Sequence, residues 1–299
     1  MEITHDLNVS IEEATLLDMH SVLNVFNIIV LELFNLAEEV GGAPDLHALH
    51  DETVAAAELL RDPQHAEKTV QQVDEFIQKL SSTIQEVVER CEAQERPSVV
   101  EIRANLESIF TILRVRAREI VARHRDPNAW VEHDVEQLRD NFTSVLQAIE
   151  RNSHGGYRIV YNVAEHEEHD YLVHFEITSA AKSTITMPAI FQDVMRDLLA
   201  NARKYTRPGG KISAGLYNSG SELRYLVQDS GVGIPESELG AIMGFGHRAS
   251  NVSDYATRGG GFGLTKAYYV TKQFGGRMWI DSQTEDPSGT RIEIRIPVP

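Results

Sequence analysis

Cysteine is nearly absent from this sequence, in which Cys91 is the only one among 299 residues. One thiol cannot form an internal disulfide or a cysteine-based zinc site, and this indicates a reducing compartment. The N-terminus lacks the basic start and apolar core of a signal peptide. The most apolar stretch, Phe26 to Ala37, contains Glu32 and Asn35 and is too short to span a bilayer. We therefore expect a cytoplasmic protein with no membrane span.

Basic residues are missing from the first 60 positions, which hold 12 acidic side chains and contribute −12 to a net charge of −17. Such a segment repels nucleic-acid phosphates and anionic membranes, so neither is an expected partner. It suits a basic protein partner, or simply solubility. Hydrophobic residues at 42% and charged residues at 24% exclude a chain that is disordered throughout, and the length allows two domains.

Hydrophobic residues recur every three or four positions through the first half of the chain. From Leu16 to Val40 this spacing predicts a helix that packs in a bundle or coiled coil, and the sequence Gly41-Gly42-Ala43-Pro44 ends it. Further helical segments are predicted at 46–60, 66–91, 99–120 and 131–149, with prolines near their boundaries. Residues 1–152 are therefore predicted to form an all-α helical bundle, complete in one chain or completed by dimerisation.

The hydrophobic period changes after the glycine-containing segment 152–156, where we expect a hinge. Strands are predicted at 157–163, 171–178, 211–217, 223–228, 277–281 and 290–296. Helices are predicted from about 186 or 188 to 205 and from 262 to 274. This mixture predicts an α+β sandwich over residues 153–299, with one sheet covered by helices on one face.

Three segments of this second half carry polar groups suited to a nucleotide. In the first, Asp197, Asn201, Lys204 and Tyr205 share one stripe of the predicted helix, opposite its apolar face. A carboxylate, a carboxamide, an ammonium and a phenol on one stripe suit Mg²⁺, phosphate and a base. Taken alone, the stripe is more typical of a solvated helix face.

The second segment is the sequence DSGVGIP at 229–235, which follows a strand. Its carboxylate can accept a hydrogen bond from an exocyclic amine, and its glycines allow close approach to a flat ring. The third is GGGFGL at 259–264, whose backbone N–H groups can bind phosphates at a helix N-terminus. The sequence has neither a lysine-containing P-loop nor a Rossmann strand–turn–helix with a downstream acid, and this disfavours those nucleotide folds.

Taken together and in this order, the three segments resemble the N, G1 and G2 boxes of the Bergerat-fold (GHKL) ATPases. That group contains gyrase, heat-shock chaperone, MutL and histidine-kinase ATP-binding domains. The sequence NARKYT at 201–206 is most similar to the histidine-kinase branch. The resemblance covers roughly residues 157–299 and implies a Bergerat-type α/β sandwich that binds ATP and Mg²⁺.

The resemblance also implies a role for individual residues. Asn201 would bind Mg²⁺, Lys204 and Tyr205 would line the phosphate and nucleoside side, and Asp229 would bind the adenine amine. The other implied contacts are Gly231 and Gly233 at the adenine ring, Gly259, Gly261, Gly263 and Leu264 over the phosphates, Thr290 near the adenine, and Arg248 (with Arg258 as a weaker candidate) at the terminal phosphate. Gly244 to Arg248 resembles the F-box that begins the ATP lid.

Asp197 departs from the kinase pattern, which often has Asn at this position, while the hydrolytic branches have Glu. A carboxylate there could order Mg²⁺-bound water or activate an attacking water, so we count Asp197 among the candidate catalytic residues.

A kinase of this family also needs a histidine on a helix, whose imidazole attacks the γ-phosphate in line. The segment 18–24 resembles a phosphoacceptor box, with His20 as the acceptor and Asn24 one turn later. Ser21, however, replaces the acidic residue that the family usually places beside the histidine. His133 retains an adjacent acid and is a rival acceptor, while His65 and His124 are weaker candidates.

The expected function is therefore that of a histidine kinase in a two-component system, a dimer through its helical region. It would autophosphorylate His20 and pass the phosphoryl group to a response-regulator aspartate. The separation from His20 to Asn201 is longer than usual for the family and fits an extra helical pair. Two alternatives remain: a protein serine kinase of the mitochondrial dehydrogenase kinase type, and a non-catalytic ATP-binding regulator or phosphotransfer scaffold.

Overall fold

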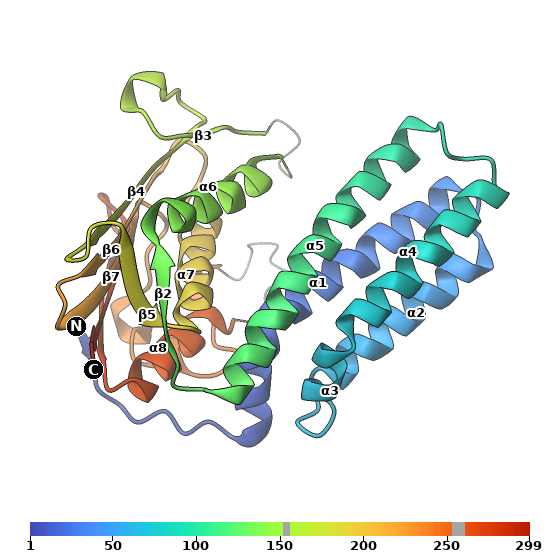
Figure 1. The fold of residues 1–299 in the computed structure, drawn as a ribbon. Helices are drawn as coiled ribbons and strands as arrows, with labels where there is room; N and C mark the ends of the chain where they lie inside the picture. The colour runs from blue at the N-terminus through green and yellow to red at the C-terminus, as the bar shows by residue number, and fades with distance from the viewer. Residues whose placement is uncertain (152–155, 253–260) are drawn as a thin grey trace. The chain divides into compact units, whose positions relative to one another are not determined.

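The computed structural model describes residues 1–151, 156–252 and 261–299, and the chain divides into two compact units (Figure 1). The helical unit is Val9–Pro127, and the sheet unit combines Met1–Asn8 with Asn128–Pro299. The division therefore lies at 127/128, whereas the sequence pattern placed it at 152/153. Most of the expected hinge at 152–156 falls outside the described residues.

Helix α6 (Val135–Arg151) accounts for this difference in the boundary. We expected it in the helical bundle, but it contacts β2, β3 and β4 of the sheet unit. Val135, Leu138, Phe142 and Leu146 are buried in the core of the sheet unit. An apolar stripe at helical spacing indicates only that one face of the helix is buried. It does not indicate whether that face packs against other helices or against a sheet.

The helical unit contains five helices, whose bounds are α1 (Ile11–Glu39), α2 (Pro44–Leu59), α3 (Ala66–Gln71), α4 (Val73–Arg90) and α5 (Pro97–Arg125). Ser10 begins α1 with a capping box, in which its side chain accepts from the Glu13 N–H and the Glu13 carboxylate accepts from the Ser10 N–H. Pro44 and Pro97 stand at the first positions of α2 and α5, where a missing N–H is harmless.

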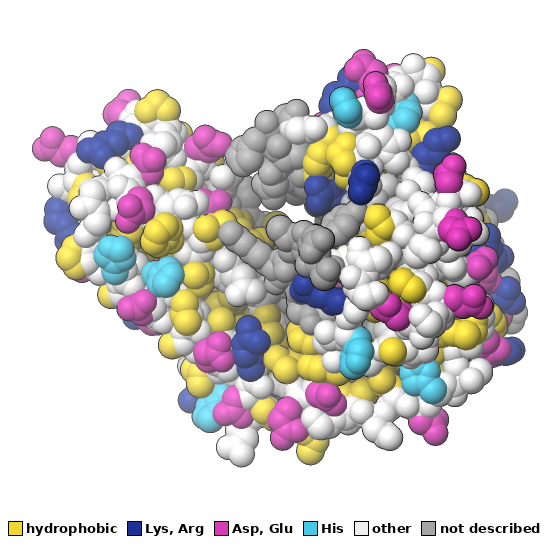
Figure 2. Space-filling view, turned by 180° about the vertical axis from the view of Figure 1, so that it is seen from behind, with side chains coloured by type: hydrophobic (Ala, Val, Ile, Leu, Met, Phe, Trp, Pro, Cys, Tyr) yellow, Lys and Arg dark blue, Asp and Glu magenta, His cyan; other side chains and the backbone are white. Residues whose placement is uncertain are grey.

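The long helices of this unit contact one another in a ring, α1 with α2, α2 with α4, α4 with α5, and α5 with α1. Their buried side chains, among them Phe26, Leu80 and Phe110, form one hydrophobic core. The described residues thus make a four-helix bundle that closes within a single chain, with the short α3 between α2 and α4. Hydrophobic side chains also reach the surface of the helical unit (Figure 2). The exposed large hydrophobic residues of this unit include Ile28, Phe34, Val100, Ile112 and Val115.

Helix α1 is longer than the apolar stretch considered in the sequence. With 29 residues it is long and apolar enough to cross a membrane by length and composition, so the expectation that this region is too short was wrong. Ten of its residues, including Phe26, Ile29 and Leu33, are nevertheless buried in the structure. Core helices of bundles meet the same length and composition criteria, so this observation does not assign a membrane span.

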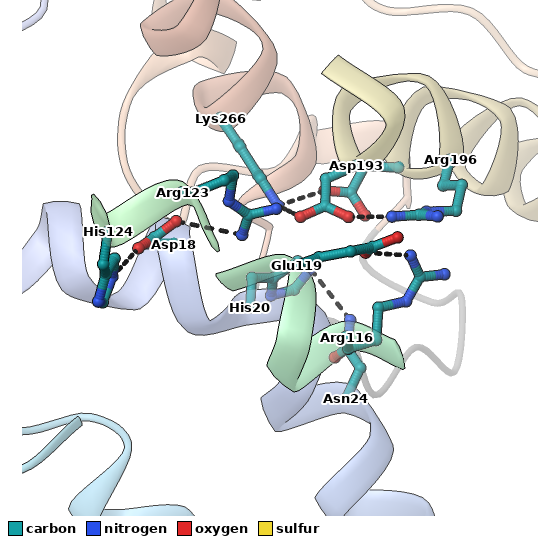
Figure 3. A network of polar contacts seen from close by, with 11 residues as sticks. Asp18, His20, Asn24, Arg116, Glu119, Arg123, His124, Asp193, Arg196 and Lys266 are labelled. Carbon is teal, nitrogen blue, oxygen red and sulfur yellow. Dashed lines mark hydrogen bonds and ion pairs between the residues drawn. The ribbon is translucent and has the colours of Figure 1, made fainter. Parts of the chain in front are cut away.

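A polar contact joins the first part of α1 to the end of α5 (Figure 3). Asp18 accepts a hydrogen bond from Arg123 Nη2 at 3.3 Å, and its other oxygen lies 2.7 Å from His124 Nε2. The hydrogen bond to Asp18 raises the pKa of His124. Asp18, two residues before His20, therefore binds α5.

The sheet unit is built on a seven-stranded sheet of order β1-β8-β9-β7-β6-β4-β3. Its strands are β1 (Glu2–Ile3), β3 (Ile159–Val160), β4 (Tyr171–Ser179), β6 (Lys211–Asn218), β7 (Glu222–Asp229), β8 (Arg277–Gln283) and β9 (Gly289–Pro297). The pairs β3–β4 and β4–β6 are parallel, and the others are antiparallel. Helices α6, α7 (Phe191–Tyr205) and α8 (Gly263–Gln273) cover one face of the sheet (Figure 1). The predicted α+β sandwich is confirmed.

Several predicted boundaries in this unit were wrong. Residues Trp130–Asp134 form strand β2, where we expected the start of a helix, and pair with β5 (Thr184–Pro188), where we expected the start of α7. The predicted strand 157–163 is reduced to two residues. The hairpin of β6 and β7 and the strands β8 and β9 lie where the alternation predicted them.

The N-terminal residues add strand β1 to the edge of the sheet, beside β8. The Ile280 N–H donates to the Met1 carbonyl at 2.9 Å, and Arg277 Nε donates to the Glu2 carboxylate at 2.7 Å. Ile3 is buried, and the Tyr268 hydroxyl donates to the His5 carbonyl at 2.6 Å. The chain thus contributes an edge strand to the sheet unit, crosses the helical unit, and returns at residue 128.

Candidate functional site

Helix α7 presents Asp197 and Asn201 one turn apart on the same stripe, as predicted. Its opposite face is anchored by Val194, Leu198 and Ala202, which are buried against the sheet. Asp197 keeps 17% of its side-chain surface exposed, but its Oδ2 is buried and has no hydrogen-bond partner in the described part of the chain. Carboxylate and amide oxygens of this kind are ligands that Mg²⁺ accepts together with nucleotide phosphates.

The first turn of α8 lies directly against this stripe. A Cβ at position 263 would lie 2.7 Å from Asn201 Nδ2 and 3.6 Å from Asp197 Cβ. Only glycine therefore fits at position 263 without displacing the Asn201 amide. The glycine-rich segment and the polar stripe, about 60 residues apart in sequence, meet here, and Leu264 packs against the core beside them.

Asp229 ends strand β7 opposite Thr290 of β9. Its Oδ1 accepts hydrogen bonds from the Gly231 N–H at 2.8 Å and from the Thr290 N–H at 3.3 Å. Burial raises the pKa of Asp229 to about 6, against the opposing effect of these two hydrogen bonds. Two backbone donors fix the carboxylate in a partly desolvated position, as a specific acceptor for an amine requires.

The loop after Asp229 is joined to the end of α7. The Val232 N–H donates to the Tyr205 carbonyl at 3.2 Å, and a Cβ at Gly231 would lie 2.6 Å from the same oxygen. Gly233 has a φ of +67°, and a Cβ there would lie 2.0 Å from the Gln283 carbonyl oxygen. Both glycines are therefore required by the close approach of other backbone segments, a reason different from the approach to a flat ring that the sequence analysis gave.

Ser282 is part of this site and was missed by the sequence analysis. Its hydroxyl donates to the Gly289 carbonyl at 3.0 Å, lies 2.8 Å from Thr290 Oγ1, and accepts from the Ile234 N–H at 2.8 Å. It thereby connects β8, β9 and the loop after Asp229. A lone serine just after a predicted strand carries no signal in sequence that it makes these contacts.

The segment from Gly244 to Arg248 packs against the glycine-rich segment. The Thr265 hydroxyl donates to the Gly244 carbonyl at 3.1 Å, and the rings of Phe245 and Phe262 are 4.5 Å apart. Gly261 has a φ of +78°, and a Cβ there would lie 3.1 Å from the Gly246 carbonyl. Gly259 and Arg258 lie outside the described residues.

Lys204 and Tyr205 close the stripe at the C-terminal end of α7. Lys204 Nζ lies 5.1 Å from the centre of the Tyr205 ring. Burial and, to a smaller extent, the positive charge of Arg248 lower the pKa of Lys204 to about 8, and burial raises the pKa of Tyr205. Three predicted side chains, those of Lys204, Tyr205 and Arg248, thus act on one another electrostatically, as groups that surround an anionic ligand do.

His20 and Asn24 belong to the helical unit and face each other across one turn of α1 (Figure 3). Asn24 Nδ2 lies 3.1 Å from His20 Nε2. The Ser21 hydroxyl beside them is buried and has no hydrogen-bond partner among the described residues. The geometry brings together the two predicted polar positions of the phosphoacceptor box, and the residue after the histidine points inward.

The rival histidines occupy other environments. His133 lies in strand β2, where Gln192 Nε2 is 3.0 Å from its Nδ1 and burial lowers its pKa. It therefore does not lie on a helix, where the resemblance would place a phosphoacceptor histidine. His65 contacts Asp62 at the start of α3, and His124 contacts Asp18 at the end of α5.

Comparison with known proteins agrees with the geometry of the sheet unit. Residues 186–299 match the family model described as histidine kinase-, DNA gyrase B- and HSP90-like ATPase. The adaptive-response sensory kinase SasA of Synechococcus elongatus is 28% identical over 180 residues, which are 54% of this chain and 46% of that protein. The sensor histidine kinase Hik2 of Thermosynechococcus vestitus is 32% identical over 108 residues, 36% of this chain and 28% of that protein.

Among solved structures, the mycobacterial sensor histidine kinase MprB aligns with a TM-score of 0.40 and 22% identity, over 56% of this chain and 97% of that one. The chain spans less than half the length of the curated relatives described above. The family match covers the polar stripe of α7, the loop after Asp229 and the glycine-rich segment, which the fold brings together. Over residues 186–299, the chain is therefore similar to the histidine kinase-, DNA gyrase B- and HSP90-like ATPases, and the curated proteins it resembles include sensor histidine kinases.

Proposed function

We propose that this chain is an ATP-dependent protein histidine kinase of a two-component system. The observation that carries the proposal is a pair of close contacts. Gly263 lies against Asn201, and Gly231 lies against Tyr205 and Asp229. It joins the three nucleotide-binding segments into one site, in the domain for which the family match was found.

In this proposal Asp229 accepts a hydrogen bond from the adenine amine, with Gly231, Gly233 and Thr290 around the ring. Asn201 holds Mg²⁺, and Asp197 orders a water bound to it or activates an attacking water. Mg²⁺, when bound, neutralises charge that develops on the phosphates. The phosphates are contacted by Gly261, Gly263 and Leu264 with Gly259, while Lys204 and Arg248 supply positive charge.

The phosphoryl acceptor in the proposal is His20. Its imidazole nitrogen forms a bond to the γ-phosphorus, the bond to the β–γ bridging oxygen breaks, ADP leaves, and the imidazole proton passes to solvent or a base. The aspartate of a response regulator then accepts the phosphoryl group. Asn24 contacts the imidazole and orients it. In the proposal, Asn24 is also the residue that assists hydrolysis of the phosphoryl group on His20.

The experiment is intact-mass measurement of the chain after incubation with ATP and Mg²⁺, with His20→Ala as the test variant. An added phosphate that is acid-labile and absent from His20→Ala is the expected result. His65→Ala, which removes a histidine outside the proposed box, is the matched control and keeps the phosphate. Phosphate that persists on His20→Ala would contradict the choice of acceptor.

Two observations favour the alternatives and give them distinct outcomes. The four-helix bundle that closes within one chain is the architecture of the serine-kinase alternative, which predicts acid-stable phosphate on a partner serine. The buried Ser21 hydroxyl, in place of an acid beside His20, favours a non-catalytic regulator or scaffold. That alternative predicts ATP binding without phosphate on the chain.

We also propose that the chain is a homodimer through the helical unit, in the cytoplasm, with α1 as a core helix and not a membrane span. The exposed hydrophobic side chains of α1 and α5 support this interface. Light scattering of the full chain is expected to give twice the chain mass of 33.5 kDa. Phe34→Glu, which charges a half-exposed position of α1, should lower that mass, and a single-chain mass for the native protein would refute the dimer.

A further inference from the structure

Lys266 of α8 is almost completely buried, with 1% of its side chain exposed. Lysine is rarely found in such a position unless its charge is paired. Its Nζ lies 3.3 Å from Asp193 Oδ2 and 3.6 Å from Asp197 Oδ2, both on α7. Figure 3 shows the Lys266 side chain pointing toward Asp193, which Arg196 also contacts.

The contact with Asp197 differs from the contact with Asp193. Asp193 has only 1% of its side chain exposed and forms ion pairs with both Lys266 and Arg196. Its carboxylate therefore neutralises the positive charge of the buried lysine. Asp197 is partly exposed, and its Oδ2 has Lys266 as the ion-pair partner but no hydrogen bond among the described residues. The ammonium thus holds the inner oxygen of a carboxylate whose remaining surface is open.

Lys266 also lies one helical turn after Gly263, the residue that contacts Asn201. The two positions share a face of α8, just as Asp197 and Asn201 share a face of α7. Gly263 therefore meets Asn201 and Lys266 meets Asp197 along a single helix–helix contact. The orientation of Asp197 relative to Asn201 is fixed by this second pair.

We infer that Lys266 is a positioning residue of the nucleotide site, which holds the Asp197 carboxylate beside Asn201 so that it can order the water of a bound Mg²⁺. The inference rests on the proposed function, because the ligand is Mg²⁺ with ATP. Lys266 itself does not touch the nucleotide in this assignment. It acts through Asp197.

The test is isothermal titration of the full chain with ATP, once with Mg²⁺ and once with a chelator. Lys266→Met is expected to weaken binding in Mg²⁺ by roughly 10-fold and to leave binding without Mg²⁺ within about 2-fold. A merely structural role would weaken both equally. Lys272→Met is the matched control, since Lys272 is an exposed lysine of the same helix, and it should bind ATP as the native chain does.

The combination with Asp197→Asn decides whether Lys266 acts through Asp197. Asp197→Asn alone should lose the same Mg²⁺-dependent part of the affinity, and Lys266→Met/Asp197→Asn should bind no more weakly than Asp197→Asn. The double variant lacks both partners of the pair, so it remains informative where Lys266→Met alone does not fold.

Additive losses in the double variant, or a Lys266→Met chain that keeps its full Mg²⁺-dependent affinity, would overturn the inference and leave the proposed function intact. A native chain that binds no ATP would overturn both.

Discussion

Asp229→Asn is expected to weaken ATP binding by between roughly 10- and 100-fold, the loss that follows when a hydrogen bond to a charged group is removed. The amide keeps an oxygen for the Gly231 and Thr290 N–H groups, so the loop can retain its shape. Its NH₂ group replaces the second carboxylate oxygen and would face the adenine amine. Both groups are hydrogen-bond donors, so the hydrogen bond to the base is lost. Isothermal titration of the full chain measures the effect.

The pH dependence of this interaction follows from the pKa of Asp229. Burial raises that pKa from 3.8 to about 6, so the folded chain favours the protonated acid. The resulting contribution to stability is fully present below pH 3.8 and is lost as the pH rises through about 6. The free energy of unfolding should fall by about 3 kcal/mol over that range from this group alone. ATP affinity should change in the opposite direction and rise through pH 6, because the ionised carboxylate is the better acceptor.

Asp281→Asn is the control for Asp229→Asn, since Asp281 is an exposed carboxylate on strand β8 of the same sheet. It should leave the affinity and its pH profile unchanged. Equal affinities for the native chain and Asp229→Asn, at every pH between 5 and 8, would show that Asp229 does not contact the base.

Gly233→Ala is expected to destabilise the sheet unit by about 3 kcal/mol or more and to abolish ATP binding. The φ of +67° strains any L side chain, and the added Cβ would lie 2.0 Å from the Gln283 carbonyl oxygen and 2.6 Å from its carbon. Neither backbone atom can move without separating the loop from β8. Denaturant unfolding followed by circular dichroism measures the loss.

Gly275→Ala distinguishes the cost of backbone strain at positive φ from the cost of a steric clash of the added Cβ. Gly275 has the same φ of +67°, but nothing lies within 4 Å of a Cβ built there. It should cost about 1 kcal/mol, from the backbone conformation alone, and leave ATP binding intact. Similar losses for the two variants would mean that the loop yields to the Cβ, and that Gly233 is not held against β8 as described.

The sequence predicted those parts of the fold and site that depend on neighbouring residues. The 3.6-residue spacing located α7 and its polar stripe, and alternation located β6, β7, β8 and β9. The resemblance of three short motifs assigned Asp229, Asn201 and the glycines to one site. The structure then brought them together, because each motif sits at the end of an element that packs against the next.

What the sequence could not predict depends on partners that are distant along the chain. Strand β1 has two residues and exists because β8, more than 270 positions later, offers an edge. The strand β2 reads as a helix start until its pairing with β5 is known. Ser282 and Lys266 are ordinary residues in their own segments, and only packing brings them to hydroxyl, carbonyl and carboxylate partners.

The added strand β1 makes the helical unit an insertion in the topology of the sheet unit. The chain enters residues 9–127 from one strand of the sheet unit and leaves them toward another, so the bundle has two covalent attachments to the same domain. Cutting one connection leaves the units linked by the other. A fragment that starts at residue 128 uncovers the β8 edge, with its free N–H and C=O groups, and acquires an aggregation-prone border that the intact chain covers with its own first residues.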